Sequence, residues 1–425
     1  MMRFKYSIFN NRLRATDKSD ILYNSFTHKS ILVPRDVELI HPDQMAPQSL
    51  EAMKSWGFIV EDDINESKRV QDILLDTMST GSIFNLIINP TLECNCRCWY
   101  CYETHHKEMV MSEVTLIHLK EFITDILSNY DELIVSFFGG EPFMEFDRIV
   151  RPIMEWTRNE CKARGKRIRY GFTTNALLIT QEMIEFLACF QNQKFQITLD
   201  GGRAFHNSTR VSRSCDSYAK VVAIVKKLAS IGCDVLLRLN LTHENLSSAF
   251  EIPLDFEECE DEVKNHIEVG CQQVWQDIQN GDLDKDFFNL RKAFKAIGIS
   301  SADKDPDSIR STCYGDKRDS IVVNYDGGLY KCTAVDFSKT KSIGNILHGN
   351  PLKAIEEDFK HYSNRKLYKA PCQHCRIWPI CAGGCYRKLS SNADHHCLFP
   401  SDEMKDEVAM NNLEEFVFIN MNKNS

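Results

Sequence analysis

The feature that most constrains the fold is a regular alternation of short apolar segments and helix-like segments that starts at Phe84. Six segments have the length and the Val, Ile, Leu and aromatic content of buried strands: residues 84–90, 132–140, 167–174, 194–200, 234–240 and 266–272. Alternating strands and helices predict parallel strands joined by right-handed crossovers. Six such units predict an open or partial α/β barrel, not a complete eightfold one.

The first of the intervening helices is expected within residues 112–130. Ser112 can cap its start, and one apolar stripe faces the core at Leu116, Leu119, Ile123, Ile126 and Leu127. The alternation ends near residue 300, so we expect the barrel to occupy residues 81–300.

The rest of the chain predicts three further parts. Residues 1–80 contain two alternating apolar stretches followed by helix-like segments, a pattern typical of a small α+β, winged-helix-like unit. Residues 301–400 are rich in cysteine, and residues 401–425 form an amphipathic helix, expected to cover the preceding domain.

Charge and cysteine content narrow the functional classes. The formal net charge of −9 argues against nucleic acid or an anionic membrane as the main partner. The start of the sequence lacks the apolar centre of a secretory signal, which predicts a cytoplasmic protein. Seventeen cysteines in a reducing compartment then indicate metal binding.

Four cysteines follow the first strand closely, in the stretch NPTLECNCRCWYCYE. Cys94, Cys98 and Cys101 are spaced so that three thiolates can bind three irons of a cubane cluster and leave the fourth iron open. If Cys96 joins them, four thiolates form a structural zinc site instead. His105 and His106 are expected to be solvated or to support the ligands.

With an aromatic residue before the third cysteine and Tyr102 after it, this stretch resembles the cysteine motif of the radical S-adenosylmethionine (SAM) superfamily. The resemblance implies a partial six-unit barrel and a [4Fe-4S] cluster on Cys94, Cys98 and Cys101. It also implies that the open iron binds SAM, which is cleaved to a 5′-deoxyadenosyl radical that abstracts hydrogen from the substrate.

Other strand ends match the same superfamily. The stretch FFGGEP ends the second strand, where the glycines would let the backbone approach a ligand and Glu141 would accept from an ammonium. TTN and TLDG end the third and fourth strands, and family members often have Ser where Thr198 stands. The resemblance implies these SAM-binding residues: Tyr100, Gly139, Gly140, Glu141, Thr174, Asn175, Thr198, Arg210 and Arg238. A structural ion pair is as good an explanation for each arginine.

Seven further cysteines lie after residue 310, more than a single site can use. Their spacing, with DGGLYKC and SIGNI, resembles the SPASM domain of peptide-modifying radical SAM enzymes. That resemblance implies a first auxiliary [4Fe-4S] cluster on Cys313, Cys332 and Cys385, with the fourth ligand unassigned. It implies a second on Cys372, Cys375, Cys381 and Cys397. A zinc ribbon on Cys372, Cys375, Cys381 and Cys385 is the alternative.

The leading hypothesis is therefore an enzyme with SAM and three [4Fe-4S] clusters that modifies a ribosomally synthesised peptide, by a thioether or another side-chain crosslink. The amino-terminal unit would bind the leader peptide as an added strand, and flavodoxin or ferredoxin would supply electrons.

The alternatives are a formylglycine-forming enzyme of the sulfatase-maturing type, modification of a small molecule, and a non-catalytic iron-sulfur scaffold or electron carrier. Sulfatase-maturing enzymes carry an aspartate base directly after the cysteine equivalent to Cys332. Here that position is Thr333, which leaves Asp336 as a weak candidate base.

Overall fold

The computed structural model describes residues 3–36, 38–79, 81–210, 216–281, 283–302, 312–368, 371–391 and 397–423. Contacts divide the chain into two compact units. One comprises residues 81–303 and 319–355, and we call it the barrel unit. The other, the terminal unit, comprises residues 1–80, 304–318 and 356–425.

The barrel unit is built on a ten-stranded sheet with the order β12-β11-β10-β9-β8-β7-β6-β13-β14-β15. Its six central strands are parallel neighbours throughout. They are β6 (Ile83–Ile88), β7 (Glu132–Phe137), β8 (Arg167–Thr174), β9 (Gln193–Leu199), β10 (Asp234–Leu241) and β11 (Ile267–Gln273). The predicted six-strand partial barrel is confirmed, because each central strand falls within or next to an expected segment.

Four shorter strands extend the sheet at its two edges. β12 (Ser300–Ser301) adds to β11 in parallel. At the other edge β13 (Ser320–Val323) runs parallel to β6. β14 (Gly328–Tyr330) and β15 (Gly344–Asn345) follow as antiparallel neighbours. The hairpin around DGGLYKC therefore belongs to the barrel unit.

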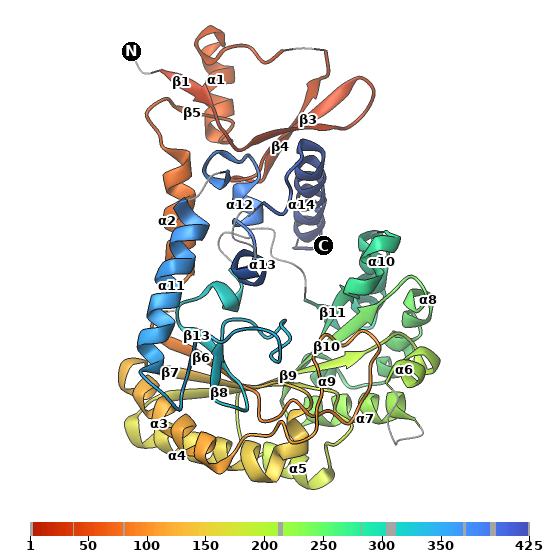
Figure 1. The fold of residues 1–425 in the computed structure, drawn as a ribbon. Helices are drawn as coiled ribbons and strands as arrows, with labels where there is room; N and C mark the ends of the chain where they lie inside the picture. Colours follow the sequence, from red (N-terminus) through yellow and green to blue (C-terminus); the bar gives the residue numbers. More distant parts are fainter. Residues whose placement is uncertain are drawn as a thin grey trace. The chain divides into compact units, whose positions relative to one another are not determined.

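Helices pack along the outer side of the central strands, as Figure 1 shows for α3, α4, α5 and α7. α3 (Glu113–Asn129) begins after Ser112, whose hydroxyl accepts from the Thr115 N–H, and all five residues of the predicted apolar stripe are buried. The other helices of this unit are α4 (Arg151–Arg164), α5 (Gln181–Leu187), α6 (Arg203–Thr209), α7 (Ser217–Ser230), α8 (Leu246–Ala249), α9 (Asp261–Lys264) and α10 (Asp284–Ala296).

The terminal unit begins with five short strands and two helices. β2 (Asn10–Arg14), β3 (Ser19–Asn24) and β4 (Lys29–Pro34) form an antiparallel sheet in that order, and β1 (Phe4–Tyr6) pairs with β5 (Ile59–Glu61). α1 (Pro47–Ser55) precedes β5 and α2 (Glu66–Thr77) follows it. The mixture of strands and helices agrees with the expected α+β composition.

The carboxy-terminal part of the terminal unit contains α11 (Pro351–Tyr368), which starts in the barrel unit, α12 (Trp378–Cys381), α13 (Tyr386–Ser391) and α14 (Asp402–Lys423). These elements share two apolar cores with residues 1–80. One core joins Phe9 and Leu74 to Trp378, and the other joins Leu13 and Tyr23 to α12 and α14. The contacts thus differ from the predicted four-part division, in which residues 1–80 stood apart.

A buried polar group also belongs to this unit. The Lys366 ammonium, 2% exposed, donates to Asp316 at 2.7 Å and to the Gly384 carbonyl at 3.0 Å. Tyr362 donates to the same aspartate. None of the helices in the described part of the chain is long and apolar enough to cross a membrane.

The stripe on α3 gives a direct test of the fold. Ile126 is fully buried, so Ile126→Ala is expected to lower stability by about 2–5 kcal/mol through lost burial and a residual cavity. Ile117 lies on the same helix and is 57% exposed, so Ile117→Ala is the matched control, with an expected change within about 0.5 kcal/mol. Urea unfolding followed by circular dichroism measures both, and equal changes would contradict the assigned helix faces.

Candidate cofactor site

The cysteine loop, residues 89–111, leaves the end of β6 and returns to α3. Its base is closed by an antiparallel bridge between Thr91 and Val110. The Leu92 N–H donates to the Met109 carbonyl, and the Met111 N–H donates to the Pro90 carbonyl, both at 2.9 Å. These bonds hold the loop at the carboxyl end of the parallel strands, where α/β folds place their sites.

The four cysteines of the loop have different surroundings. Cys96 is 1% exposed and belongs to the barrel core, while Cys94 and Cys98 are partly exposed and Cys101 is exposed. The Cys96 N–H donates to the Cys94 sulfur at 3.4 Å. Hydrogen bonding from Cys96 lowers the pKa of Cys94 to about 6, while burial raises that of Cys98 to about 11. The three predicted cluster ligands are therefore the three accessible thiols.

His105 supports the outermost ligand. Its Nδ1 lies 2.7 Å from the Leu92 carbonyl, which makes Nδ1 the protonated nitrogen, and its Nε2 lies 3.3 Å from the Cys101 sulfur. His105 therefore orients Cys101, in keeping with the expected supporting role.

The turn Gly139-Gly140-Glu141 after β7 lies directly against the cysteine loop. Gly139 has φ +105°, and a Cβ there would lie 2.3 Å from the Thr91 carbonyl oxygen. A Cβ on Gly140 would lie 2.1 Å from the Glu93 carbonyl oxygen. The N–H groups of Gly140 and Glu141 donate to Thr91 and Glu93 at 3.0 and 2.8 Å. The glycines therefore allow close approach to the backbone of the loop, and their expected approach to a ligand stays a prediction.

Glu141 links this turn to the end of β8. Its fully buried carboxylate accepts from the Thr174 hydroxyl at 2.7 Å and from the Asn175 N–H at 2.8 Å, and it also caps the Phe143 N–H. Burial raises its pKa to about 7. These bonds fix the carboxylate in place, and its acceptor role toward an ammonium stays a prediction. Asn175 in turn donates to Asn95 at 2.8 Å, with its amide 3.9 Å from the Cys94 sulfur.

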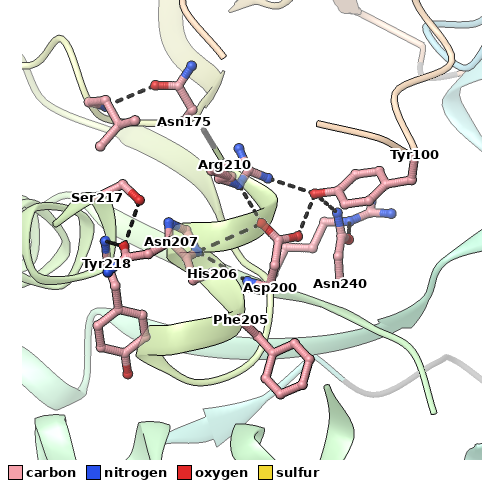
Figure 2. Close-up of polar contacts among 12 residues, drawn as sticks. Tyr100, Asn175, Asp200, Phe205, His206, Asn207, Arg210, Ser217, Tyr218 and Asn240 are labelled. Atoms are coloured by element: carbon pink, nitrogen blue, oxygen red, sulfur yellow. Dashed lines mark hydrogen bonds and ion pairs between the residues drawn. The ribbon is translucent and has the colours of Figure 1, made fainter. Parts of the chain in front are cut away.

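A second polar network, drawn in Figure 2, is centred on Asp200 at the end of β9. Asp200 is 1% exposed and accepts from Arg210 Nε at 2.6 Å and from the Tyr100 hydroxyl at 2.5 Å. Arg210 and Asn240 each donate to the Tyr100 oxygen at 3.1 Å. Because Tyr100 belongs to the cysteine loop, this network ties the loop to β9 and β10.

Thr198 and Arg238 lie beside the network. They are partners across β9 and β10, and Arg238 Nε donates to Asn240 Oδ1 at 2.9 Å. Burial lowers the pKa of Arg238. All the SAM-binding residues implied by the sequence therefore lie on the cysteine loop, on or just after β7 to β10, or, for Arg210, just after α6.

Sequence reasoning missed three members of this region, Asp200, His206 and Asn240. Asp200 is an acidic residue at a strand end in TLDG, a signal that could have drawn attention to it. His206 is fully buried; its Nδ1 accepts from the Asp200 N–H at 3.3 Å, and burial lowers its pKa to about 4. Its Nε2 is buried and has no hydrogen-bond partner within the described residues.

Asp336, the weak candidate base, is occupied by other contacts. It accepts from the Thr104 hydroxyl at 2.8 Å, from the N–H and hydroxyl of Ser338, and pairs with Lys339 at 2.9 Å. These bonds outweigh burial and hold its pKa well below the usual range. The arrangement favours a structural role in the turn, and a catalytic role remains only a prediction.

The carboxy-terminal cysteines fall into both units. Cys372, Cys375, Cys381 and Cys397 line one cavity of about 220 Å³ in the terminal unit. Cys313 and Cys385 belong to the same unit and Cys332 to the barrel unit, so the set implied for the first auxiliary cluster stays a prediction.

The described His, Cys, Asp and Glu side chains nowhere form a group of three or more that could hold a single metal ion. A four-iron cluster is larger than one ion, and its ligands stand further apart. In the first loop the zinc alternative also lacks an accessible fourth thiol, because Cys96 lies in the core.

A model of the Radical SAM superfamily matches residues 88–252. The cysteine loop and the strands around it therefore match the radical SAM superfamily. The matched residues run from the end of β6 to beyond α8 and include the cysteine loop, the glycine turn and the Asp200 network.

Two curated proteins are similar to parts of the chain. The radical SAM cyclopropyl synthase TigE of Paramaledivibacter caminithermalis is 25% identical over 183 residues, 36% of this chain and 38% of TigE. The match thus spans less than half of TigE. The uncharacterized protein MJ0907 of Methanocaldococcus jannaschii is 23% identical over 63% of this chain and 91% of its own length.

Solved structures share the fold over most of the chain. The structure of anSMEcpe with bound AdoMet and the Cp18Cys peptide has a TM-score of 0.60 at 19% identity, covering 80% of this chain and 99% of that one. Streptococcus suis SuiB bound to the precursor peptide SuiA has a TM-score of 0.55 at 14% identity, covering 92% and 97%.

The burial of Cys96 predicts different outcomes for two neighbouring cysteines of the radical SAM loop. Cys96→Ala keeps the backbone N–H that donates to Cys94 and is expected to retain iron at the loop and SAM cleavage. Cys98→Ala removes an accessible thiol and is expected to lose both. Iron and sulfide analysis of anaerobically reconstituted protein measures the first, and 5′-deoxyadenosine formation measures the second. Loss of iron in both variants would mean that Cys96 is a ligand.

The Asp200 network predicts that removal of one charge strongly lowers the stability of the protein. Asp200→Asn leaves Arg210 buried without its counter-charge, and an unpaired buried charge costs about 3–5 kcal/mol of stability. The pair between Lys166 and the exposed Asp131 supplies the control, since Asp131→Asn is expected to leave stability nearly unchanged. Urea unfolding of the two variants gives the comparison, and a small effect at Asp200 would show that the network is dispensable.

Proposed function

We propose that the chain is a peptide-modifying radical SAM enzyme that acts on a ribosomally synthesised precursor. The observation that carries the proposal is the three-thiol loop, with Cys94, Cys98 and Cys101 accessible and the fourth cysteine buried. Three thiolates suit a [4Fe-4S] cluster with one iron left for SAM. With SAM bound, such a cluster supplies a 5′-deoxyadenosyl radical that abstracts a hydrogen atom from the substrate.

The residues around the loop act as binding and positioning groups in this proposal. Arg210 has one guanidinium edge held by Asp200 and Tyr100, so the cation stays fixed and is available to pair with the SAM carboxylate. Thr198 and Asn175 add a hydroxyl and an amide at neighbouring strand ends. His105 holds Cys101 through a fixed tautomer. These groups are preorganised, which lowers the cost of ordering them when the cofactor binds.

A peptide substrate is supported by the likeness to anSMEcpe and SuiB, whose structures contain the Cp18Cys peptide and the precursor peptide SuiA. The terminal unit adds a second argument. β4 lies at the end of the β2-β3-β4 sheet, and within the described residues it pairs with β3 alone. Leu32 on this edge is 70% exposed. An open edge with an exposed apolar side chain suits a leader peptide that binds as an added strand.

Two auxiliary clusters complete the proposed cofactor set. Cys372, Cys375, Cys381 and Cys397 share one cavity, which supports one of them. A cluster that accepts an electron from a substrate radical would allow a net two-electron oxidation, and this favours a thioether or another side-chain crosslink. The reductant would be flavodoxin or ferredoxin.

Two assays test the proposal in order. Anaerobic enzyme with SAM and a chemical reductant is expected to form 5′-deoxyadenosine, and Cys98→Ala serves as the inactive control. If a short open reading frame for a precursor peptide is found next to the gene, coexpression with it is expected to remove about two mass units from the peptide per crosslink. An absence of 5′-deoxyadenosine would overturn the enzyme assignment. An unchanged peptide mass with deuterium uptake would replace crosslinking by epimerisation.

A further inference from the structure

Trp378 carries a buried hydrogen-bond donor without an acceptor. Trp378 is the first residue of α12 and is 1% exposed. Its indole Nε1 is fully buried and has no hydrogen-bond partner in the described part of the chain. An indole N–H can only donate, and a buried donor without an acceptor destabilises the fold. Native proteins seldom keep such a group unless an ion, a water molecule or a ligand supplies the acceptor.

The donor lies beside the four-cysteine cavity. Trp378 lines the cavity together with Cys372, Cys375, Cys381 and Cys397. Gly383 also lines it, at φ +79°, and a Cβ on that glycine would lie 3.4 Å from Trp378 Nε1. The indole nitrogen therefore lies close to the glycine turn that follows Cys381.

The position of the ring is fixed from two sides. Its apolar face packs in the core formed by Phe9, Val70 and Leu74 from the amino-terminal part of the chain. The backbone N–H of Trp378 donates to the Cys375 carbonyl at 3.0 Å, and the backbone N–H of Ala382 donates to the Trp378 carbonyl at 2.8 Å. Lys366 holds the glycine turn through the Gly384 carbonyl. A donor held this firmly can be aimed at a single acceptor.

We propose that Trp378 Nε1 donates a hydrogen bond to a sulfur of the iron-sulfur cluster bound by Cys372, Cys375, Cys381 and Cys397. This inference rests on the auxiliary cluster of the proposed function. A hydrogen bond to sulfur stabilises the reduced cluster, which carries one more negative charge, and so raises the reduction potential. Trp378 is thus a positioning and tuning residue that does not touch the substrate.

Two other side-chain donors line the cavity, His374 and Lys405. His374 is exposed to solvent, which leaves Lys405 to weigh. Its ammonium pairs with Asp402 at 3.3 Å, and its side chain is partly exposed. Solvent and the carboxylate therefore already satisfy Lys405, whereas Trp378 has neither. The indole is the donor whose partner is missing.

The first experiment uses the full chain with Cys94, Cys98 and Cys101 replaced by alanine, so that only auxiliary clusters remain. Trp378→Phe in this background is expected to keep iron and sulfide content. At a fixed potential near the midpoint, its ratio of reduced to oxidised cluster is expected to fall about threefold to tenfold, as followed by electron paramagnetic resonance. Trp56→Phe is the matched control, because Trp56 lies in the same unit, is 42% exposed and is absent from the cavity lining; it should leave the ratio unchanged.

The second experiment leaves Trp378 unchanged, so it does not depend on the folding of a Trp378 variant. Protein labelled with indole-¹⁵N tryptophan is expected to show a ¹⁵N coupling to the reduced auxiliary cluster, because Trp378 is the one tryptophan among the described residues that line the cavity. An unchanged ratio in Trp378→Phe together with no ¹⁵N coupling would overturn the inference while leaving the cluster assignment intact. Absence of iron from the triple-alanine background would instead overturn the auxiliary-cluster assignment.

Discussion

The barrel unit depends on the contact between the glycine turn after β7 and the backbone of the cysteine loop. The N–H groups of Gly140 and Glu141 bond to loop carbonyls, and a side chain on either glycine would collide with them. A loop proposed to carry three iron ligands must hold its thiols at fixed separations. Backbone contact with a strand end achieves this without using any thiol, and it leaves the sulfur atoms available for metal.

The Asp200 network secures the other side of the same loop. Tyr100 reaches from the loop to Asp200, Arg210 and Asn240, on or after two neighbouring strands. A neutral residue at position 200 would leave the buried Arg210 guanidinium without a counter-charge. The ion pair and the hydrogen bond that anchors Tyr100 therefore both depend on Asp200. Arg210 serves both as the partner of Asp200 and as the cation proposed for the SAM carboxylate, which explains why sequence alone could not separate these two roles.

The sequence predicted the barrel because local patterns determine it. Buried parallel strands need continuous apolar runs and α3 needs its stripe, and both are visible in a single chain. The internal hydrogen bonds of Glu141 and Asp200 could not be predicted, because their partners Thr174 and Tyr100 lie 33 and 100 residues away in the sequence. The shared core of the terminal unit was missed for the same reason, since Phe9 and Trp378 meet only in three dimensions.

That shared core has a consequence for the four-cysteine cavity. Phe9 and the α2 residues Val70 and Leu74 pack with Trp378 on α12, the helix that also carries Cys381. The Ser25 hydroxyl donates at 2.6 Å to the carbonyl of Arg376, a residue between Cys375 and Cys381 in the sequence. The amino-terminal part therefore helps to fix cysteines, far away in sequence, that are proposed to bind an auxiliary cluster. If this part also binds a leader peptide, the peptide would bind to the same folded unit that holds the auxiliary cysteines. Occupancy of the peptide site and order at the cluster would then be coupled through one apolar core.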